Sequence, residues 1–270
     1  ELWQFHDHAF VPGTTVRADL VGNEHLRWGY PGGECVVLIN DYFITCHDNA
    51  YRVPQWVSYH LTAENVTGAV ERTDDFRPDP RLPEGRRAEL KDYEGSGYDR
   101  GHMAPAAAFR RSEAAMSRTF LLSNMSPQTP SLNRLMWRML EEDVRELASK
   151  SANIWVFTGS LFLDENGSLI EPTFFIGENG VAVPTHFYKV VLAEFRAPPA
   201  SAASRANLFA FVMPNQPAPL AGEPSDYLVT VDLVEALSGL DFFSVLPDSL
   251  EDRLEEEVAT TWPIGKGTNQ

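Results

Sequence analysis

The chain has 270 residues, and its hydrophobic content of 43% is ordinary for a soluble globular protein with one large domain or two small ones. No run approaches the roughly 18 uninterrupted apolar residues that a membrane helix needs, so a membrane-spanning protein is not expected. The formal net charge of −16, taken alone, argues against nucleic acid as a partner, because non-specific binding usually rests on basic residues.

The acidic residues are concentrated near the C-terminus. Residues 223–257 hold eleven acidic residues against Arg253 alone, which accounts for −10 of the −16. Residues 72–145 hold thirteen basic and twelve acidic residues, so this segment is about neutral and can present a local positive surface. The charge therefore weakens a nucleic-acid function without excluding it.

The N-terminal part predicts a polar arm followed by an antiparallel sheet. In the arm, the triplet His6-Asp7-His8 is either a metal-binding motif or, as is more common, part of a polar terminus. Alternating β-branched or aromatic and polar residues then predict three strands, the third after a break at Pro54. These strands are 36–40, 42–48 and 56–62.

The two cysteines, Cys35 and Cys46, bracket the hairpin CVVLINDYFITC that the first two of these strands would form. A turn at Asn40-Asp41 would place the two cysteines directly opposite each other, where a cross-strand disulfide can form. Two buried free thiols are an equally acceptable interpretation, because cysteine is often a core residue.

The middle of the chain predicts a charged loop and then the best helix. Residues 71–97 hold three prolines and three glycines among charged residues, which is typical of an ordered surface loop. Apolar residues at helical spacing predict a helix from Ser131 to Lys150. Between them we expect a short helix at 111–118 capped by Ser112, a strand at 119–125 and a turn at 126–131.

The C-terminal part predicts further strands and two short helices. The strands are expected at 154–163, where a hairpin turns at Asn166-Gly167, and at 174–177, 186–195 and 207–214. The helices are expected at 230–239 and 248–259. The fold class that follows is α+β, with a mixed, mainly antiparallel sheet.

The residues with the clearest chemistry lie between Tyr98 and Arg145. The segment begins with DRGHMAP, in which His102 is the only histidine, and continues with LLSNMSPQTPSLNRLMWRMLEEDVREL. A histidine can take a proton from water near neutral pH, an amide oxygen can bind a hard cation, and arginines can bind phosphate. The shared chemistry of these residue types is phosphodiester cleavage.

On the predicted helix, polar residues recur every four positions. Asn133, Trp137, Glu141 and Arg145 would lie along one slowly drifting stripe. The alternative is that the stripe is only the polar flank of an amphipathic helix, and Trp137 is more simply a core residue than a base-stacking one.

Taken together, these motifs resemble the DNA/RNA non-specific endonuclease family, which includes secreted bacterial nucleases and endonuclease G-like enzymes. The resemblance rests on DRGH, the Asn-Pro-Gln turn and the LN…W…LE helix, and extends in order through WVSYHLT, RTDDFRPDP and HFYKVV. It covers about residues 27–255 of a single nuclease domain, with 1–26 as an N-terminal arm and 256–270 as a C-terminal tail. It implies a ββα-metal finger that holds one divalent cation, usually Mg²⁺, for which Mn²⁺ can substitute.

The resemblance also implies roles for individual residues. His102 matches the family's general base, Asn133 its direct metal ligand, and Glu141 the acidic residue that holds metal-bound water. The residues that match phosphate-binding, supporting or site-shaping positions are Arg72 with Arg77 as its alternative, Arg100, Arg145, Asn124 and Asp99. Because the base must be neutral to work, we expect an amide or backbone acceptor, rather than a carboxylate, to orient the His102 ring.

The expected activity is metal-dependent, sequence-non-specific cleavage of DNA and RNA that leaves 5′-phosphate ends. Two alternatives remain: a degenerate member of the same fold that binds nucleic acid or a partner without cutting, and a phosphodiesterase for a small substrate, which would suit the acidic charge. Further partners implied by the resemblance are a second copy of the chain and a protein inhibitor. The expected location is secreted or periplasmic, with mitochondrial as the alternative.

Overall fold

The computed structural model describes residues 20–195, 205–246 and 262–264, so the His6-Asp7-His8 triplet and the helix predicted at 248–259 lie outside the described residues. The centre of the fold is a seven-stranded sheet in which every neighbouring pair is antiparallel. Across the sheet the strands are β1 (Val36–Ile39), β2 (Ile44–Asp48), β3 (Val53–Leu61), β6 (Asn153–Leu161), β9 (His186–Phe195), β10 (Arg205–Pro214) and β11 (Leu228–Val229).

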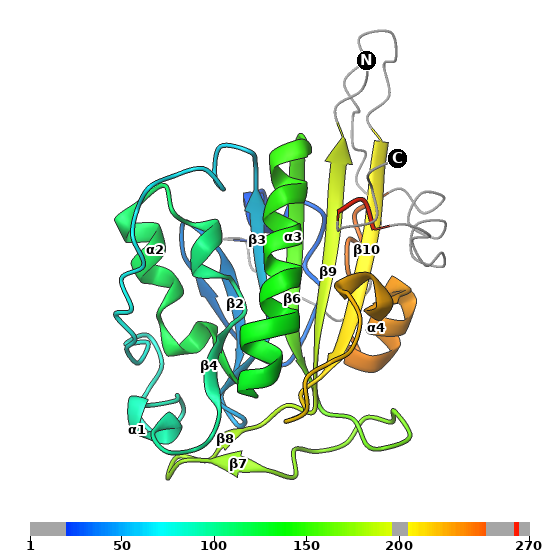
Figure 1. Cartoon of the computed structure of the whole chain (residues 1–270). Helices are drawn as coiled ribbons and strands as arrows, with labels where there is room; N and C mark the ends of the chain where they lie inside the picture. Colours follow the sequence, from blue (N-terminus) through cyan, green and yellow to red (C-terminus); the bar gives the residue numbers. More distant parts are fainter. Residues whose placement is uncertain (1–19, 196–204, 247–261, 265–270) are drawn as a thin grey trace, which may run out of the picture.

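The sheet carries an apolar core on each of its two faces, because alternate side chains of a strand point to opposite faces. On β9, Phe187 and Val191 belong to the core under helix α3 (Trp137–Lys150), whereas Tyr188 and Val190 belong to the core on the other face. Figure 1 shows α3 lying along the sheet over β6 and β9. The predicted α+β class with a mainly antiparallel sheet is confirmed.

A small two-stranded ribbon and the start of α3 form a ββα arrangement beside the large sheet. The ribbon pairs β4 (Asp99–His102) with β5 (Met125–Gln128), and a π-helical turn, η4 (Leu132–Met136), leads into α3. The strand predicted at 119–125 is wrong, and so is the turn predicted at its C-terminal side, because β5 occupies part of that turn. The apolar run that suggested a strand is buried around a short helical turn, and burial in a core hides the difference between the two periods.

The two cysteines form a disulfide with a Cα–Cα distance of 5.3 Å. The predicted register is nevertheless wrong, because Cys46 pairs with Val37 and not with Cys35. The side-chain amide oxygen of Asn40 accepts hydrogen bonds from two backbone N–H groups of the turn, and this turn ends two residues later than expected. The disulfide therefore joins positions that are diagonal in the ladder.

The predicted strand break at Pro54 is not found. Pro54 lies inside β3 beside a register shift of β2, where a missing N–H is tolerated.

The remaining loops and helices are close to expectation. The loop at 71–97 contains one short helix, α1 (Leu90–Tyr93), and the hairpin after β6 is reduced to an isolated bridge. The helices α2 (Glu113–Thr119) and α4 (Val231–Ser238) are capped by Ser112 and Thr230, as predicted.

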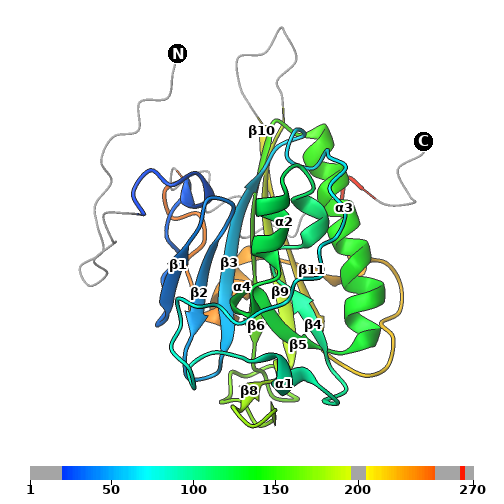
Figure 2. The ribbon, with the colours of Figure 1, turned by 90° about the vertical axis from the view of Figure 1, so that its left-hand side faces the viewer.

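A second small ribbon lies at the end of the molecule where β4 begins. It pairs β7 (Phe175–Ile176) with β8 (Val181–Ala182), and Figures 1 and 2 both place it next to α1, beyond the ends of the long strands. Among the described residues, no helix is long and apolar enough to cross a membrane.

Candidate active site

His102 lies at the end of β4 in an apolar pocket. Its side chain is 8% exposed, and its ring packs against those of Phe76 and Phe120, with centroid distances of 5.7 and 5.0 Å. Burial, followed by the nearby charges of Arg72 and Arg100, lowers the pKa of His102 to about 3. The imidazole is therefore neutral at physiological pH and can accept a proton.

The orientation of the His102 ring differs from expectation. Its Nε2 atom is buried without a hydrogen-bond partner, and no described residue supplies the amide or backbone acceptor that we predicted for the ring. The two aromatic rings hold the imidazole instead, and because Nε2 is enclosed, Nδ1 is the ring nitrogen that can face a substrate or water.

The residue before His102 is Gly101, and close packing explains why a side chain is not tolerated there. A Cβ atom there would lie 2.1 Å from the side-chain oxygen of Gln128 on the paired strand. Because Gln128 is fully buried, the neighbour has no room to move away. The glycine therefore permits the close approach of β5 behind the histidine.

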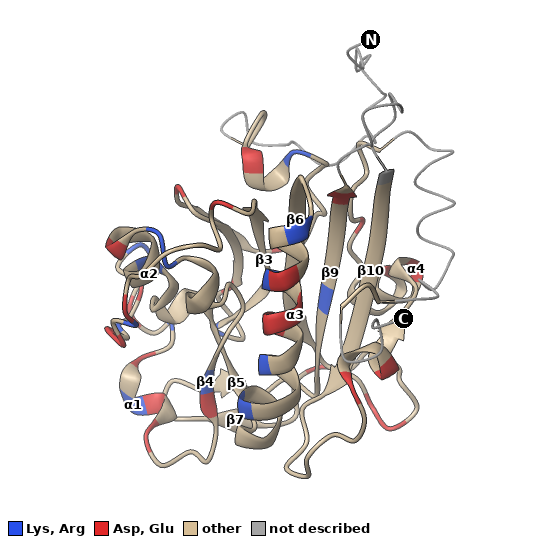
Figure 3. Ribbon diagram, turned by 45° about the horizontal axis from the view of Figure 1, so that its top comes forward, with Lys and Arg blue, Asp and Glu red and all other residues tan. Residues whose placement is uncertain are grey.

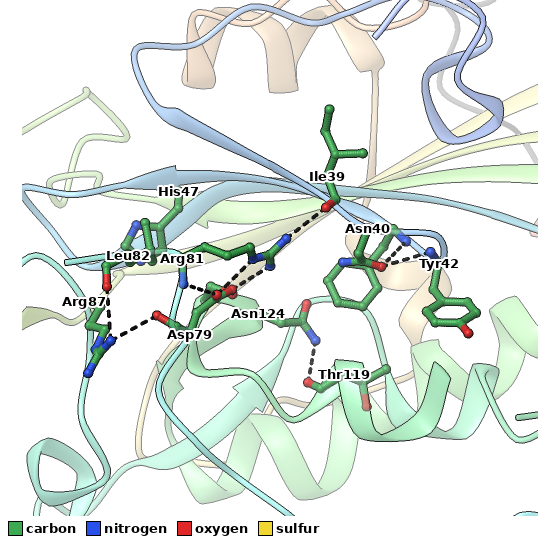
Figure 4. A network of polar contacts seen from close by, with 12 residues as sticks. Ile39, Asn40, Tyr42, His47, Asp79, Arg81, Leu82, Arg87, Thr119 and Asn124 are labelled. Carbon is green, nitrogen blue, oxygen red and sulfur yellow. Dashed lines mark hydrogen bonds and ion pairs between the residues drawn. The ribbon is translucent and has the colours of Figure 1, made fainter. Parts of the chain in front are cut away.

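Asn124 supports the backbone that follows His102. Its side chain is fully buried, accepts a hydrogen bond from the Ala104 N–H (2.9 Å), and donates to the carbonyl oxygens of Ala104 and Thr119 (2.9 and 2.8 Å). All of these bonds are internal, as Figure 4 shows for Thr119. The Asn124 amide is therefore engaged in fixing the backbone that follows His102, which fits the site-shaping position that the resemblance implies.

Asp79, which sequence reasoning missed, ties the long loop to the sheet. Its buried carboxylate accepts hydrogen bonds from the Arg81 guanidinium (2.9 and 2.6 Å) and from the Ser123 hydroxyl (2.6 Å). The same guanidinium donates to the Ile39 carbonyl oxygen at the end of β1 (Figure 4). This network fixes the loop that carries Arg72 and the turn that carries Asn124.

Of the two alternative arginines in the loop, Arg72 lies at the histidine. Its guanidinium is 4.8 Å from the centroid of the Phe120 ring, and its charge acts on both His102 and Glu141. Arg72 donates from Nε to Asp74 (2.6 Å), whereas Arg77 donates to Asp75 (2.6 Å) and to the Ser117 carbonyl oxygen (3.0 Å), which ties the loop to α2.

Arg100 projects from β4 on the same side as His102, two residues away. Its guanidinium lies 4.2 Å from the centroid of the Phe76 ring, which also touches His102. Two guanidinium groups thus flank the imidazole, and both can pair with the oxygens of a phosphate.

Asn133 is held by a carboxylate from β4. Its side-chain nitrogen donates to Asp99 (2.9 Å), and Arg134 donates to both oxygens of the same carboxylate (2.7 and 2.6 Å). These bonds outweigh the effect of burial and lower the pKa of Asp99. With its nitrogen engaged, the Asn133 amide presents its oxygen away from Asp99, as a cation ligand must.

The position of Asn133 on the helix was not fully anticipated. It lies in the π-helical turn, so the regular spacing of Trp137, Glu141 and Arg145 begins only after it. Trp137 is fully buried and is a core residue, as expected.

Glu141 faces a buried lysine that sequence reasoning placed only as an ordinary strand residue. Lys189 is completely buried, donates to the Thr158 hydroxyl (2.7 Å) and lies 4.7 Å from the centroid of the Trp137 ring. Burial raises the pKa of Glu141 to about 7, while Lys189, Arg145 and Arg72 oppose that rise. A site that binds a cation needs the ionised carboxylate, and these three positive charges favour it.

The charged side chains are interleaved around the site. In Figure 3, basic and acidic segments alternate along α3, and basic ones also occur on β4 and around α2. Basic and acidic residues are therefore interleaved along these elements of the described chain.

Removal of the imidazole is expected to change how stability depends on pH. The unfolded chain takes up a proton on His102 near pH 6.5, whereas the folded protein does so only near pH 3, so the free energy of unfolding should decrease as the pH falls from about 6.5. The slope is about 1.4 kcal/mol per pH unit. Urea unfolding at pH 7, 6 and 5 in EDTA should show that the difference between His102→Asn and the wild type changes by less than this between pH 7 and 6 and approaches this rate between pH 6 and 5.

The difference in stability between His102→Asn and the wild type reports on the imidazole of His102 alone. The carboxyls of Glu141 and Glu235, whose pKa values are raised to about 7, act with the opposite sign over this range, but they are present in both proteins and cancel. Parallel stability curves for the two proteins would show that His102 is not desolvated in the folded state.

A second expectation concerns the buried lysine. Lys189→Met removes the charge that most opposes the rise in the pKa of Glu141, so this pKa should move above about 7. Carbon-13 NMR of the glutamate carboxyl groups across pH 5–9 measures it directly. An unchanged titration would mean that Lys189 and Glu141 are not coupled, and Lys150→Met, which removes an exposed lysine of α3, is the control.

The donor set suits a hard cation bound by few protein ligands. Among the described residues there is no cluster of three or more His, Cys, Asp or Glu side chains that could hold a metal ion. One amide oxygen from Asn133 and a carboxylate from Glu141 agree with an ion that keeps most of its waters, which is characteristic of Mg²⁺. Such residues would not suit zinc, which prefers nitrogen and sulfur ligands.

Comparison with known proteins gives consistent matches. The model of the DNA/RNA non-specific endonuclease family matches residues 21–249. The chain is 38% identical to "Nuclease EXOG, mitochondrial" of Danio rerio over 91% of this chain and 70% of the relative, and 39% identical to "Endonuclease G, mitochondrial" of Homo sapiens over 81% and 73%. A solved structure described as the EndoG/EndoGI complex matches with a TM-score of 0.76 and 36% identity over 87% of this chain and 95% of that one.

Proposed function

The chain belongs to the DNA/RNA non-specific endonuclease family and is a nuclease, and from this premise we propose how it cuts. His102 accepts a proton from the water that attacks the scissile phosphate. Arg72 and Arg100 bind the phosphate oxygens, and Arg145 supports the position of Glu141. The products carry 5′-phosphate ends.

The observation that carries this proposal is the buried His102 ring packed against Phe76 and Phe120, whose rings are also contacted by the Arg100 and Arg72 guanidinium groups. Positive neighbours keep the proton off His102 before the reaction and attract the anionic substrate to it. As the phosphate binds, its negative charge offsets these cations, so the imidazole becomes a stronger base when the substrate is in place. The site thus couples substrate binding to activation of the base.

The family is metal-dependent, and the residues of this chain fit one Mg²⁺ ion, for which Mn²⁺ can substitute. Asn133 would bind it directly and Glu141 through water, with Asp99 orienting the amide. When bound, the ion supplies positive charge that stabilises the transition state and the departing 3′ oxygen. Arg134 keeps both oxygens of Asp99 occupied, so Asp99 acts as an orienting acceptor.

The substrates are DNA and RNA without sequence preference. The side chains that converge on His102 are arginines, which recognise phosphate groups and carry no base information. Nothing in this arrangement requires a 2′-hydroxyl, so both polymers are accepted.

Incubation of the purified protein with supercoiled plasmid and with single-stranded RNA tests the proposal. Both should be degraded with Mg²⁺ or Mn²⁺, and EDTA should stop the reaction. Failure to cut either polymer with several divalent metals would contradict it. Terminal labelling of the fragments with and without phosphatase treatment distinguishes 5′-phosphate from 3′-phosphate ends.

Compartment and partners are inferred from the relatives. Several of them are named as mitochondrial, which supports a mitochondrial location for this chain and gives no support to a secreted or periplasmic one. The similar EndoG/EndoGI structure supports a protein inhibitor as a partner, and we retain a homodimer as the assembly. Fluorescence microscopy of the tagged protein and sedimentation of the purified chain test the location and the assembly. We further propose a single nuclease domain with its core at 27–255, with support from the family match over residues 21–249.

A further inference from the structure

Two phenylalanines on the β7–β8 ribbon are exposed although most large apolar side chains of the chain are buried. Phe174 is 54% exposed and Phe175 is 45% exposed, and they are the only aromatic residues among the exposed large hydrophobic side chains of the described ranges. Burial of an aromatic ring against a ligand is favourable, and adjacent exposed rings can therefore provide a binding surface.

The two rings have different surroundings. Phe174 contacts Tyr98, with ring centroids 6.1 Å apart at 45°. Because successive side chains of an extended segment point in opposite directions, Phe175 faces away from this contact. Phe174 and Tyr98 therefore form one continuous surface, which we call the aromatic step. Phe175 is the same residue type but lies outside this surface.

The aromatic step is continuous with the candidate active site. Tyr98 immediately precedes β4, and along an extended chain Tyr98, Arg100 and His102 point to the same side. At about 3.3 Å per residue, Tyr98 lies about 13 Å from the histidine along this row. The Arg100 guanidinium, which can bind a phosphate, stands between them.

The ribbon that carries Phe174 is firmly attached. At its turn, Asn179 donates from its backbone and side chain to Asp92 of α1 (3.1, 3.1 and 3.0 Å). On its other side, the backbone of β8 donates to the Tyr51 carbonyl oxygen (2.9 Å). Figures 1 and 2 show the ribbon packed beside α1 at this end of the molecule. A ring held in this way binds a ligand without the entropic loss of ordering a loop.

On these observations we propose that the aromatic step stacks on an unpaired base of the substrate near the scissile phosphate. This inference rests on the proposed nuclease function. Base stacking tolerates any sequence because every base has an aromatic face, so it agrees with non-specific cleavage. In an intact duplex the base faces are covered by their neighbours, whereas single strands and nicked or frayed ends expose them. The aromatic step thus favours single-stranded substrate.

The test compares Phe174→Ala with Phe175→Ala on a single-stranded oligonucleotide and on a duplex of the same sequence. Stacking of one base contributes about 1–3 kcal/mol, so Phe174→Ala should raise KM for the single strand by roughly 5- to 150-fold and should affect the duplex much less. Phe174→Trp should retain the preference. Phe175→Ala and Leu169→Ala, which removes an exposed aliphatic side chain before the ribbon, should leave the ratio of the two rates unchanged.

A readout independent of cleavage uses a single-stranded oligonucleotide with 2-aminopurine at successive positions, bound to the His102→Ala background in EDTA. Quenching of the fluorescence at one position, lost in Phe174→Ala and kept in Phe175→Ala, is expected. If the wild-type protein cuts both substrates but Phe174→Ala changes neither the ratio nor the quenching, this inference is wrong while the nuclease function stands. A change of sedimentation coefficient in Phe174→Ala would identify the ring as a contact between copies of the chain and would also overturn it.

Discussion

Replacement of His102 by alanine is expected to lower the rate of phosphodiester cleavage by about 10²- to 10⁴-fold, the range for loss of a positioned general base. The effect should be on kcat more than on KM, because the imidazole acts on the attacking water while Arg72 and Arg100 still bind the phosphate. Initial rates on plasmid and on RNA in Mg²⁺ measure it, with circular dichroism and thermal unfolding to confirm that the fold is intact.

The matched control is His60→Ala. His60 is a partly buried histidine whose ring stacks on Trp155 at a centroid distance of 4.8 Å and contacts Asn153. Trp155 belongs to the core on the other face of the sheet from the one that the residues after β4 join. Its loss should leave cleavage within about twofold, as for surface or structural positions away from the reacting groups. Equal losses in the two variants would point to a folding defect and would contradict the assigned role of His102.

Replacement of Asn133 by alanine is expected to weaken the binding of Mg²⁺ by at least about tenfold, because even indirect partners of a metal ligand contribute 10- to 100-fold. Asn133→Asp keeps an oxygen ligand but places a second carboxylate beside Asp99, where the amide nitrogen now donates at 2.9 Å. The Asn133→Asp variant should therefore bind Mg²⁺ only as the pH rises and the added carboxyl ionises. Isothermal titration with Mg²⁺ and Mn²⁺ measures both variants, and the metal dependence of cleavage follows from the same series.

Arg138→Ala provides the control on the same helix. Arg138 is bonded to Glu142 one turn on, and both side chains are exposed. This variant should bind Mg²⁺ as the wild type does. If Asn133→Ala also binds Mg²⁺ normally, the amide is not a ligand and the ion is held elsewhere.

Sequence reasoning could predict those parts of the site that depend on local pattern. The helical period between Ser131 and Lys150 predicted α3 and placed Glu141 and Arg145 on one side of it. This helical spacing is a short-range property, which the order of residues determines directly. The position of His102 was implied only by the resemblance, through the ββα finger, and β4 with β5 and α3 has this arrangement in the fold.

The parts that were missed depend on contacts between distant segments. The π-helical turn at Asn133 leaves no mark in the apolar spacing, which predicted a regular helix from Ser131. Asn124 looked like a polar site residue, but its three internal bonds can be known only when Ala104 and Thr119 are placed beside it. The register of the first hairpin was wrong because the Asn40 side chain extends the turn.

Lys189 is the case in which a sequence signal existed. It occupies a position of β9 that alternation assigns to the buried face between Phe187 and Val191. A lysine at such a position requires a partner inside the protein, because an unpaired buried charge is strongly destabilising. That requirement pointed to an acidic residue on the covering helix, and Glu141 is the charge with which it interacts.

Imidazole rescue of His102→Ala tests the central role of His102 most directly. Removal of the side chain leaves a space beside the Phe76–Phe120 ring pair that an imidazole molecule can enter. Added imidazole should restore part of the cleavage in Mg²⁺, in proportion to the concentration of its neutral form, and should not accelerate Asn133→Ala. Cleavage by His102→Ala at the wild-type rate without imidazole would contradict the role of His102 as the base.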